Sequence, residues 1–306
     1  MEKRTNAALA LRRRLGDRLG AVIDYHLRPI AASVERNRAL LEQLSVRLGE
    51  VTENGSPGRL SFTCNICSQT NSVPVVEFHR EVPSCSACGS NPRFRAIIHV
   101  LTTELTGRST TLDELSAQHH ITGIGLTDWE GYASRLSNKF DYINTFYDSE
   151  PQLDIAAPDT RFLGSADFVI ATDVFEHVPP PVSVGFSNAR RLLRPGGVFI
   201  LSVPYCDGDR TIEHYPDLHD FEIIEDSTGH KVRNRTAKGE VQEFDNPVFH
   251  GGPGLNLEMR FFSKKSLRSE LESAGFKRIA FYPANDLIHG AYWPDNQSLP
   301  VAARVD

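Results

Sequence analysis

The sequence has 306 residues, of which 40% are hydrophobic and 24% are charged, so it is long enough for about two domains and a sizeable core. Its net charge of −6 is unevenly distributed: residues 1–50 carry ten basic and six acidic side chains, and the remainder carries 23 basic and 33 acidic ones. An acidic main body argues against tight, sequence-blind binding to nucleic acid, although it still allows a local basic groove.

The start of the sequence lacks the pattern of an exported protein. Residues 1–20 carry charges throughout and have no apolar stretch of the length found in secretory signals. No later apolar run is long enough to span a bilayer. We therefore expect a cytoplasmic protein without a membrane partner, in which cysteines stay reduced and are available for metal.

Residues 1–50 have apolar side chains at helical spacing and arginines between them, and Pro29 is expected to kink the helix. This pattern predicts an amphipathic helical arm. The arm would pack on the body, join two copies as a homodimer, or contact an anionic partner, and we favour these in that order. Residues 51–59 include the turn-forming run Asn54-Gly-Ser-Pro-Gly58 and are expected to form a linker.

Residues 60–92 contain two Cys-x-x-Cys pairs with seventeen residues between them, Cys64 and Cys67 followed by Cys85 and Cys88. Four thiolates in two close pairs suit tetrahedral zinc, and such a set leaves no coordination position open. The pattern therefore predicts a small zinc ribbon with a structural zinc ion. Disulfides are the alternative, and the expected reducing compartment disfavours them.

A helix is predicted from residue 92 to 107, because Asn91 and Pro92 form a helix-start signal and Gly107 a stop. Strands and helices then alternate. Strands are expected at 121–125, 140–147, 168–171, 198–203, 277–282 and 299–305, and helices at 129–139, 182–193 and 263–274. This order predicts a doubly wound, Rossmann-like, mostly parallel α/β sheet over residues 93–306. Residues 206–258 look like an insertion too irregular to belong to the core.

Two motifs flank the helix at 182–193. Asp173-Val-Phe-Glu-His-Val178 follows one buried strand, and Leu193-Arg-Pro-Gly-Gly197 precedes the next. Together they resemble the fourth- and fifth-strand motifs of class I S-adenosylmethionine-dependent methyltransferases, and the resemblance extends over roughly residues 60–305. It implies methyl transfer with S-adenosylmethionine as the cofactor. Another doubly wound enzyme with a similar crossover is the alternative.

The same resemblance implies a set of cofactor-binding residues. In the family a Gly-x-Gly-x-Gly loop ends the first strand; Gly123 and Gly125 match it, and the third glycine is absent. Asp148 would hold the ribose hydroxyls and Asp154 the adenine amino group. The methionine end would meet Thr172 and Asp173. Each aspartate taken singly is also a common turn or cap residue.

Methyl transfer requires an aligned acceptor and, for a hydroxyl or amine, a group that removes a proton. His177 lies nearest the expected cofactor edge, although its Glu-His pair equally suits helix-start packing. The insertion adds His214, His219 and His250, with Tyr205 at its entrance. Family insertions at this place cover the acceptor, so these residues are expected to build its pocket. A metal on His214 and His219 is the weaker alternative to hydrogen bonding.

The expected acceptor is a small molecule, a sugar or a glycan. Zinc ribbons also contact RNA, so an RNA methyltransferase guided by the ribbon is the first alternative. The second is a non-catalytic zinc-ribbon scaffold whose cofactor loop has decayed, because the third glycine is missing.

Overall fold

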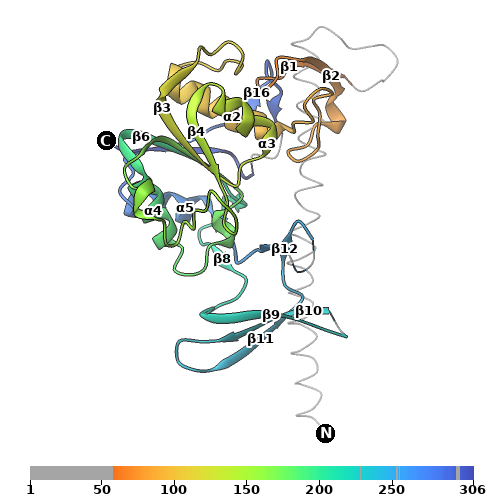
Figure 1. Cartoon of the computed structure of the whole chain (residues 1–306). Coiled ribbons are helices and arrows are strands. Elements are labelled where there is room, and N and C mark those ends of the chain that lie inside the picture. The colour runs from red at the N-terminus through yellow and green to blue at the C-terminus, as the bar shows by residue number, and fades with distance from the viewer. Residues whose placement is uncertain (1–57, 228, 253, 255, 294–296) are drawn as a thin grey trace.

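The computed structural model describes residues 58–306 except 228, 253, 255 and 294–296 (Figure 1). The arm predicted for residues 1–50, the homodimer predicted through it and residues 51–57 of the predicted linker lie outside the described residues. Among the helices that are described, none is both long and apolar enough to cross a membrane.

A six-stranded sheet forms the centre of the fold, with strand order β15-β18-β6-β5-β3-β4. The strands are β3 (Gln118–Leu126), β4 (Phe140–Thr145), β5 (Ala166–Thr172), β6 (Leu193–Ser202), β15 (Arg278–Phe281) and β18 (Val301–Arg304). Strands β4, β3, β5 and β6 run parallel, whereas β18 is antiparallel to both its neighbours. The predicted doubly wound, mostly parallel sheet is confirmed.

Helices cover both faces of this sheet (Figure 1). One layer holds α2 (Pro92–Thr106) and α3 (Glu130–Ser137), and the other holds α4 (Ser183–Leu192) and α5 (Lys264–Ser273). Strand β5 shows why its sequence is apolar throughout: Phe168 and Ile170 pack toward the first layer, whereas Val169 and Ala171 pack toward the second.

The helix ends follow the local sequence signals. The Asn91 side chain accepts a hydrogen bond from the backbone N–H of Phe94 at 2.9 Å, and Gly107 ends α2 with φ of 79°. At α5 the Ser263 hydroxyl accepts from the N–H of Ser266 at 3.0 Å. Short 3-10 turns complete the helical elements: η1 (Val75–Glu77), η2 (Thr160–Phe162) and η3 (Phe175–His177).

The insertion is more regular than its sequence indicates. It contains an antiparallel sheet of β9 (Asp220–Asp226), β10 (Gly229–Arg235) and β11 (Val241–Asp245), and its own small core is Tyr215, Leu218, Val232, Leu257 and Met259. The expectation of irregular structure was wrong. The exposed strands carry cross-strand ion pairs instead of the alternation of apolar and polar residues by which strands are recognised in a sequence. Arg233, for example, pairs with Glu222 and Glu243.

Short strands join the insertion and the C-terminal segment to the body. They are β7 (Tyr205–Cys206), β8 (Ile212–Glu213), β12 (Phe249–His250), β13 (Asn256–Leu257), β14 (Arg260–Ser263), β16 (Asn285–Asp286) and β17 (Ala291–Tyr292). Strand β14 pairs with both β7 and β8, so the chain enters and leaves the insertion at one place.

The cysteine-rich segment begins with the hairpin of β1 (Arg59–Thr63) and β2 (Thr70–Pro74) and is fastened to the body through Arg95. Arg95 is fully buried. Its guanidinium donates to the Gly290 carbonyl at 2.9 Å, the Ser90 carbonyl at 2.7 Å and the Ser84 hydroxyl at 2.6 Å, and it lies 4.5 Å from the centre of the Phe62 ring. The hairpin, α2 and one face of the sheet consequently share one hydrophobic core.

This packing predicts that Arg95→Lys is strongly destabilising. A lysine ammonium cannot reach all of these acceptors, so buried oxygens would lose their partners, at about 1–3 kcal/mol each. We expect the free energy of unfolding in urea to fall by about 3 kcal/mol. The exposed Arg161 provides a matched control, since Arg161→Lys should change stability by less than about 0.5 kcal/mol. Equal, small effects of both substitutions would contradict this role for Arg95.

Candidate functional site

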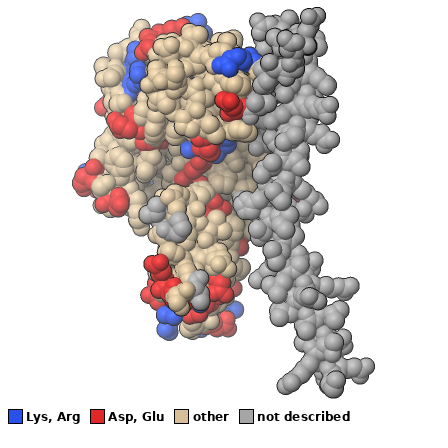
Figure 2. Space-filling view, turned by 90° about the vertical axis from the view of Figure 1, so that its right-hand side faces the viewer, with Lys and Arg blue, Asp and Glu red and all other residues tan. Residues whose placement is uncertain are grey.

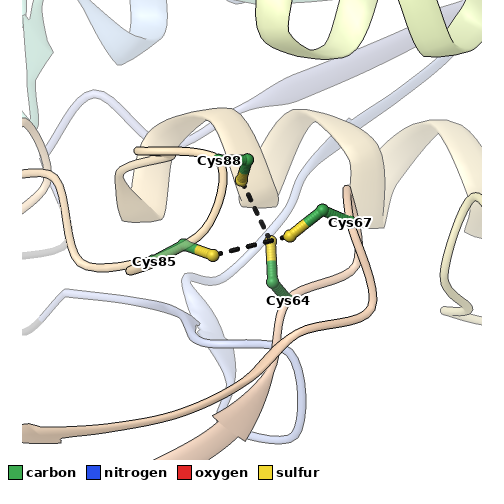
Figure 3. Close-up of side chains that lie close together, drawn as sticks. All are labelled: Cys64, Cys67, Cys85 and Cys88. Carbon is green, nitrogen blue, oxygen red and sulfur yellow. Dashed lines mark hydrogen bonds between the residues drawn. The ribbon is translucent and has the colours of Figure 1, made fainter.

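The four cysteines converge on one point between the hairpin and α2 (Figure 3). The sulfur atoms of Cys64 and Cys88 are 3.7 Å apart, those of Cys67 and Cys85 are 3.5 Å apart, and all four lie within 4.8 Å of one another. Ligands at a Zn–S distance of about 2.3 Å in a tetrahedron are about 3.8 Å apart. The donor set therefore fits a tetrahedral zinc ion.

Each cysteine pair lies on a similar tight turn. The residue after each pair has a positive φ, 58° at Ser68 and 74° at Gly89. The N–H of each of these residues returns to the carbonyl of the first cysteine of its pair, at 2.8 Å and 3.0 Å. Glycine adopts this conformation without strain, which explains Gly89.

A cavity of about 880 Å³ opens at the carboxyl ends of β5 and β6, the edge where open α/β sheets bind ligands. Four parts of the chain line it: the cysteine-rich segment with the start of α2, the loops after β5 and β6, the insertion, and the C-terminal segment. The lining residues are Arg80, Glu81, Arg93, Asp173, His177, Pro204, Cys206, Ile212, Phe249, His250, Gly251, Asn256, Phe261, Gln297 and Ser298.

One wall of the cavity is an ion-pair cluster on Asp173. Arg80 Nη2 lies 3.2 Å and Arg93 Nε 3.3 Å from the two Asp173 carboxylate oxygens, and Glu81 pairs with both arginines. The Ser202 hydroxyl also donates to Asp173 at 3.0 Å. Burial alone would raise the pKa of Asp173, but the two guanidinium groups outweigh it and lower the pKa. Asp173 is therefore ionised and held in place.

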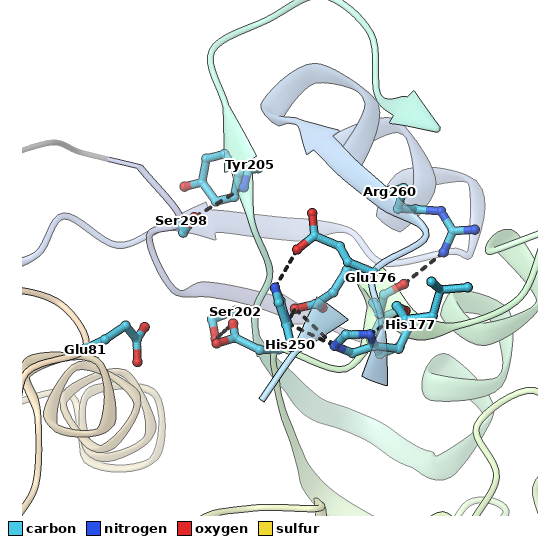
Figure 4. A network of polar contacts seen from close by, with 12 residues as sticks. Glu81, Glu176, His177, Ser202, Tyr205, His250, Arg260 and Ser298 are labelled. Carbon is cyan, nitrogen blue, oxygen red and sulfur yellow. Dashed lines mark hydrogen bonds and ion pairs between the residues drawn. The ribbon is translucent and has the colours of Figure 1, made fainter. Parts of the chain in front are cut away.

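The opposite wall is a histidine–glutamate cluster, part of which is drawn in Figure 4. His250 Nε2 lies 2.5 Å from Glu258 Oε2, and His214 Nε2 lies 2.9 Å from Glu258 Oε1. His177 Nε2 lies 3.1 Å from His250 Nδ1. Burial lowers the pKa of His177, whereas the hydrogen bond with Glu258 raises the pKa of His250. The two histidines facing the cavity therefore differ in basicity.

Glu258 is the anionic centre of this cluster. Burial would raise the pKa of Glu258, but its hydrogen bonds with His214 and His250 hold the pKa at about 2. It is therefore a carboxylate at neutral pH, placed to accept hydrogen bonds from two imidazoles at once.

Glu176 lies beside these histidines and is completely buried. Within the described part of the chain, neither of its carboxylate oxygens has a hydrogen-bond partner. Burial raises the pKa of Glu176 well above its usual range. Arg260 holds the turn that carries Glu176 and His177, because its Nη1 donates to the Phe175 carbonyl at 3.0 Å. The buried acid is thus fixed next to His177, which lines the cavity.

The two glycines at the end of β3 have packing roles in the structure. A Cβ on Gly123 would lie 2.1 Å from the Phe168 ring, and one on Gly125 would lie 2.0 Å from the Tyr142 hydroxyl. Asp128, on the same loop, accepts hydrogen bonds from the hydroxyls of Tyr142 at 2.6 Å and Tyr132 at 2.7 Å. The space beside Gly125 is therefore filled by the protein's own side chains.

The remaining predicted cofactor residues lie at the same edge of the sheet, outside the cavity lining. Asp148 is exposed after β4, next to Tyr147, whose exposed fraction is 70%. Asp154 lies in a turn and accepts from the N–H of Ala156 at 2.8 Å, and the segment before it meets β4 through a single bridge from Gln152 to Phe146. Thr172 is buried at the end of β5.

The structure brings together three of the predicted catalytic residues, His177, His214 and His250. His219 is exposed on the turn before β9 and does not line the cavity. Tyr205 is buried against Phe281 and does not line it either.

Sequence reasoning missed Arg80, Arg93, Glu176 and Glu258 as members of the site. Glu176 was visible as the partner of His177 in the motif at 173–178. The other three lie far from that motif in the sequence, and no local pattern marks them.

Comparison with known families gave two matches. A model described as a methyltransferase domain matches residues 106–280, and one described as the vacuolar protein sorting 36 NZF-N zinc-finger domain matches residues 57–113. A comparison with curated protein sequences gave no match.

Solved structures of methyltransferases are similar to the chain at low identity. The citrinin polyketide synthase CMeT domain is 12% identical with a TM-score of 0.35, over 60% of this chain and 46% of its own length. The Burkholderia thailandensis 1,6-didemethyltoxoflavin-N1-methyltransferase is 14% identical with a TM-score of 0.37, over 69% of this chain and 79% of its own length. CalS10, an amino pentose methyltransferase from Micromonospora echinaspora, is 12% identical with a TM-score of 0.39, over 71% of this chain and 93% of its own length.

The Asp128 environment predicts a pH dependence of stability. Burial raises the pKa of Asp128 to about 7, although both tyrosine hydroxyls and Arg93 act to lower it. In the unfolded chain the pKa is about 3.9. Between about pH 4 and 7 only the unfolded state releases this proton, so rising pH favours unfolding by up to about 1.4 kcal/mol per unit.

The substitution Asp128→Asn should remove the contribution of this carboxyl group to the pH dependence of stability. The stability of the wild type relative to the variant is expected to fall as pH rises from about 4 to 7 and to level off above. Urea unfolding across this range measures it, and Asp113→Asn, at an exposed position, is the control. A constant difference between wild type and Asp128→Asn would contradict a buried, neutral Asp128.

Proposed function

This chain belongs to the methyltransferase domain family, whose model covers more than half of it, and we propose that it transfers a methyl group from S-adenosylmethionine to a small-molecule or glycan acceptor. The observation that carries the proposal is the cavity at the carboxyl ends of β5 and β6, with charged side chains on one wall and imidazoles on the other. Its volume of about 880 Å³ is of the size of small-molecule sites.

The charged wall suits the amino-acid end of the cofactor. Arg80 Nε is buried and, as far as the structure describes the chain, has no hydrogen-bond partner, so it offers an unused donor to a carboxylate. Arg93 and Asp173 lie beside it. Asp148, with the exposed Tyr147, is placed at the end of β4 where the ribose and adenine would lie, and Asp154 and Thr172 flank the same edge.

When bound, S-adenosylmethionine supplies an electrophilic methyl group that an oxygen or nitrogen of the acceptor attacks in line. On this chain's side, His177 and His250 line the cavity, where they would contact the polar group of the acceptor. Glu258 and His214 hold His250 in position.

We propose that the four-cysteine site holds a structural zinc ion, as the spacing of its sulfur atoms supports. Its role is to fold the segment that delivers Arg80 to the cavity. A cytoplasmic location, a homodimer through residues 1–50, and the domain boundaries at residues 50, 60 and 93 stay predictions of the sequence.

An RNA acceptor remains the first alternative, and the surface gives it little support. In the view of Figure 2, basic and acidic side chains lie intermixed over the sheet β9–β11. Lys231 and Arg233 there are engaged with acidic residues of the neighbouring strands, which reduces their attraction for phosphates.

Calorimetry with S-adenosylhomocysteine tests the cofactor assignment. We expect binding by the wild type and a roughly 10-fold or larger loss of affinity in Asp148→Asn, because charge-assisted hydrogen bonds to the ribose would be removed. Asp141→Asn, an exposed position at the other end of β4, should bind like the wild type. A folded wild type without affinity would favour the non-catalytic scaffold.

Labelled methyl transfer into a cell extract identifies the acceptor class. The label is expected in the small-molecule or polysaccharide fraction, whereas label in RNA would overturn the proposed acceptor.

Substitution of the cysteines tests the zinc site. Protein loaded with Co²⁺ should show thiolate-to-metal charge-transfer absorption, which Cys67→Ser should weaken together with the thermal stability. Cys206→Ser provides the control, because Cys206 lies outside the four-cysteine cluster and should leave the absorption unchanged. Equal spectra for the two variants would contradict the site.

A further inference from the structure

We propose that Glu176, His177 and His250 bind a second metal ion, separate from the four-cysteine site, on the side of the cavity that the two histidines line. The three side chains come from η3 and β12, which are more than seventy residues apart in the sequence. In Figure 4 they lie together and point toward one another. Each offers one ligand atom, and these atoms lie within 4.8 Å of one another.

The separations of the ligand atoms fit a single ion. His177 Nε2 and His250 Nδ1 are 3.1 Å apart, and Glu176 Oε1 is 3.5 Å from His250 Nδ1 and 3.9 Å from His177 Nε2. Ligands about 2.1 Å from an ion are about 3.0 Å apart at right angles and about 3.4 Å apart in a tetrahedron. A small inward movement of the Glu176 carboxylate would complete this geometry.

The outer nitrogens of both histidines are engaged as in metal-binding histidines. His177 Nδ1 lies 2.8 Å from the Leu257 carbonyl oxygen, which only accepts, so this nitrogen carries the proton and Nε2 is left with a lone pair. His250 Nε2 faces the Glu258 carboxylate in the same way. Backbone carbonyls and carboxylates are the usual partners of the second nitrogen in metal-binding histidines.

The burial of Glu176 is an independent observation that points to a bound cation. Its side chain is 0% exposed, and its two oxygens lack any hydrogen-bond partner across residues 58–306 as far as these are described. A buried carboxylate without a partner is costly, and a cation between it and the two imidazoles would remove that cost. Arg80 and Arg93, which line the same cavity, are already paired with Asp173 and Glu81.

Two imidazoles and one carboxylate favour a first-row transition ion such as Zn²⁺ or Fe²⁺ over Mg²⁺ or Ca²⁺, which prefer oxygen ligands. Three protein ligands leave coordination positions open, and His177 and His250 line the cavity, so these positions face it. The substrate class that fits is an acceptor with a hydroxyl or other oxygen able to bind the ion, a step that rests on the proposed function.

Metal content tests the site without any cofactor. After dialysis with Zn²⁺ and removal of loose metal, the wild type should hold about two zinc ions per chain and Glu176→Gln about one. His219→Ala is the matched control, because His219 is an exposed histidine of the insertion that also carries His250. This variant should keep two zinc ions per chain. One ion in the wild type, or two in Glu176→Gln, would overturn the proposal.

Cobalt spectra of the wild type keep the test decisive if Glu176→Gln does not fold. The first Co²⁺ equivalent should give thiolate charge transfer, and the second should add only ligand-field bands of a nitrogen and oxygen site. A second equivalent without new bands would contradict the site.

Separate measurements distinguish this proposal from the proposed function. In Glu176→Gln, transfer should fall roughly 10-fold or more, with affinity for S-adenosylhomocysteine changed less than about 3-fold. If the wild type holds a second metal ion but does not bind S-adenosylhomocysteine, the metal site is supported and the proposed reaction is refuted. If Glu176→Gln holds one metal ion and still transfers methyl groups at the wild-type rate, the second ion has no role in binding the acceptor.

Discussion

The buried guanidinium of Arg95 is the contact on which the arrangement of the site depends. It joins the second cysteine turn, through Ser84 and Ser90, to the C-terminal segment at Gly290. Because Arg95 lies on the first turn of α2, these contacts also fix Arg93, two residues earlier, against Asp173. The fold of the cysteine-rich segment therefore sets the position of an arginine that lines the cavity.

The loop after β5 carries two buried acids in different environments. Asp173 meets two arginines and a hydroxyl, and their attraction outweighs the cost of burying its charge. Glu176, three residues later, is fully buried, and the ion-pair partners described for it are the imidazoles of His250 at 3.5 Å and His177 at 3.9 Å rather than a guanidinium. A buried carboxyl group without a hydrogen-bond partner either takes up a proton or is stabilised by a cation, so the contrast between these neighbours makes Glu176 the candidate ligand of the proposed ion.

Local signals in the sequence predicted the framework of the fold. The apolar run at Phe168–Ala171, the cap at Asn91 and the cysteine spacing each depend on neighbours close in sequence, and the structure has the strand, the helix start and the cysteine cluster there. Arg80 and Glu258 could not be assigned in this way, because the contacts of Arg80 with Asp173 and of Glu258 with His214 span 93 and 44 positions of the sequence. The insertion escaped recognition because its strands are largely exposed and charged, which hides the alternation of a buried face.

The glycines of β3 show how a correct pattern can have a different physical cause. Gly123 and Gly125 match the start of the family's glycine loop, yet the room they create is taken by Phe168, Tyr142 and Asp128. On the proposed function, this loop then contributes less to cofactor binding than in a three-glycine site, and the charged groups delivered by the cysteine-rich segment contribute more. That segment and α2 share a core with the sheet, so removing it would take away both a wall of the cavity and part of the core. On the proposed function, the cysteine-rich segment is part of the methyltransferase site, and the proposed zinc ion would support binding at a distance by holding Arg80 and Arg93 in place.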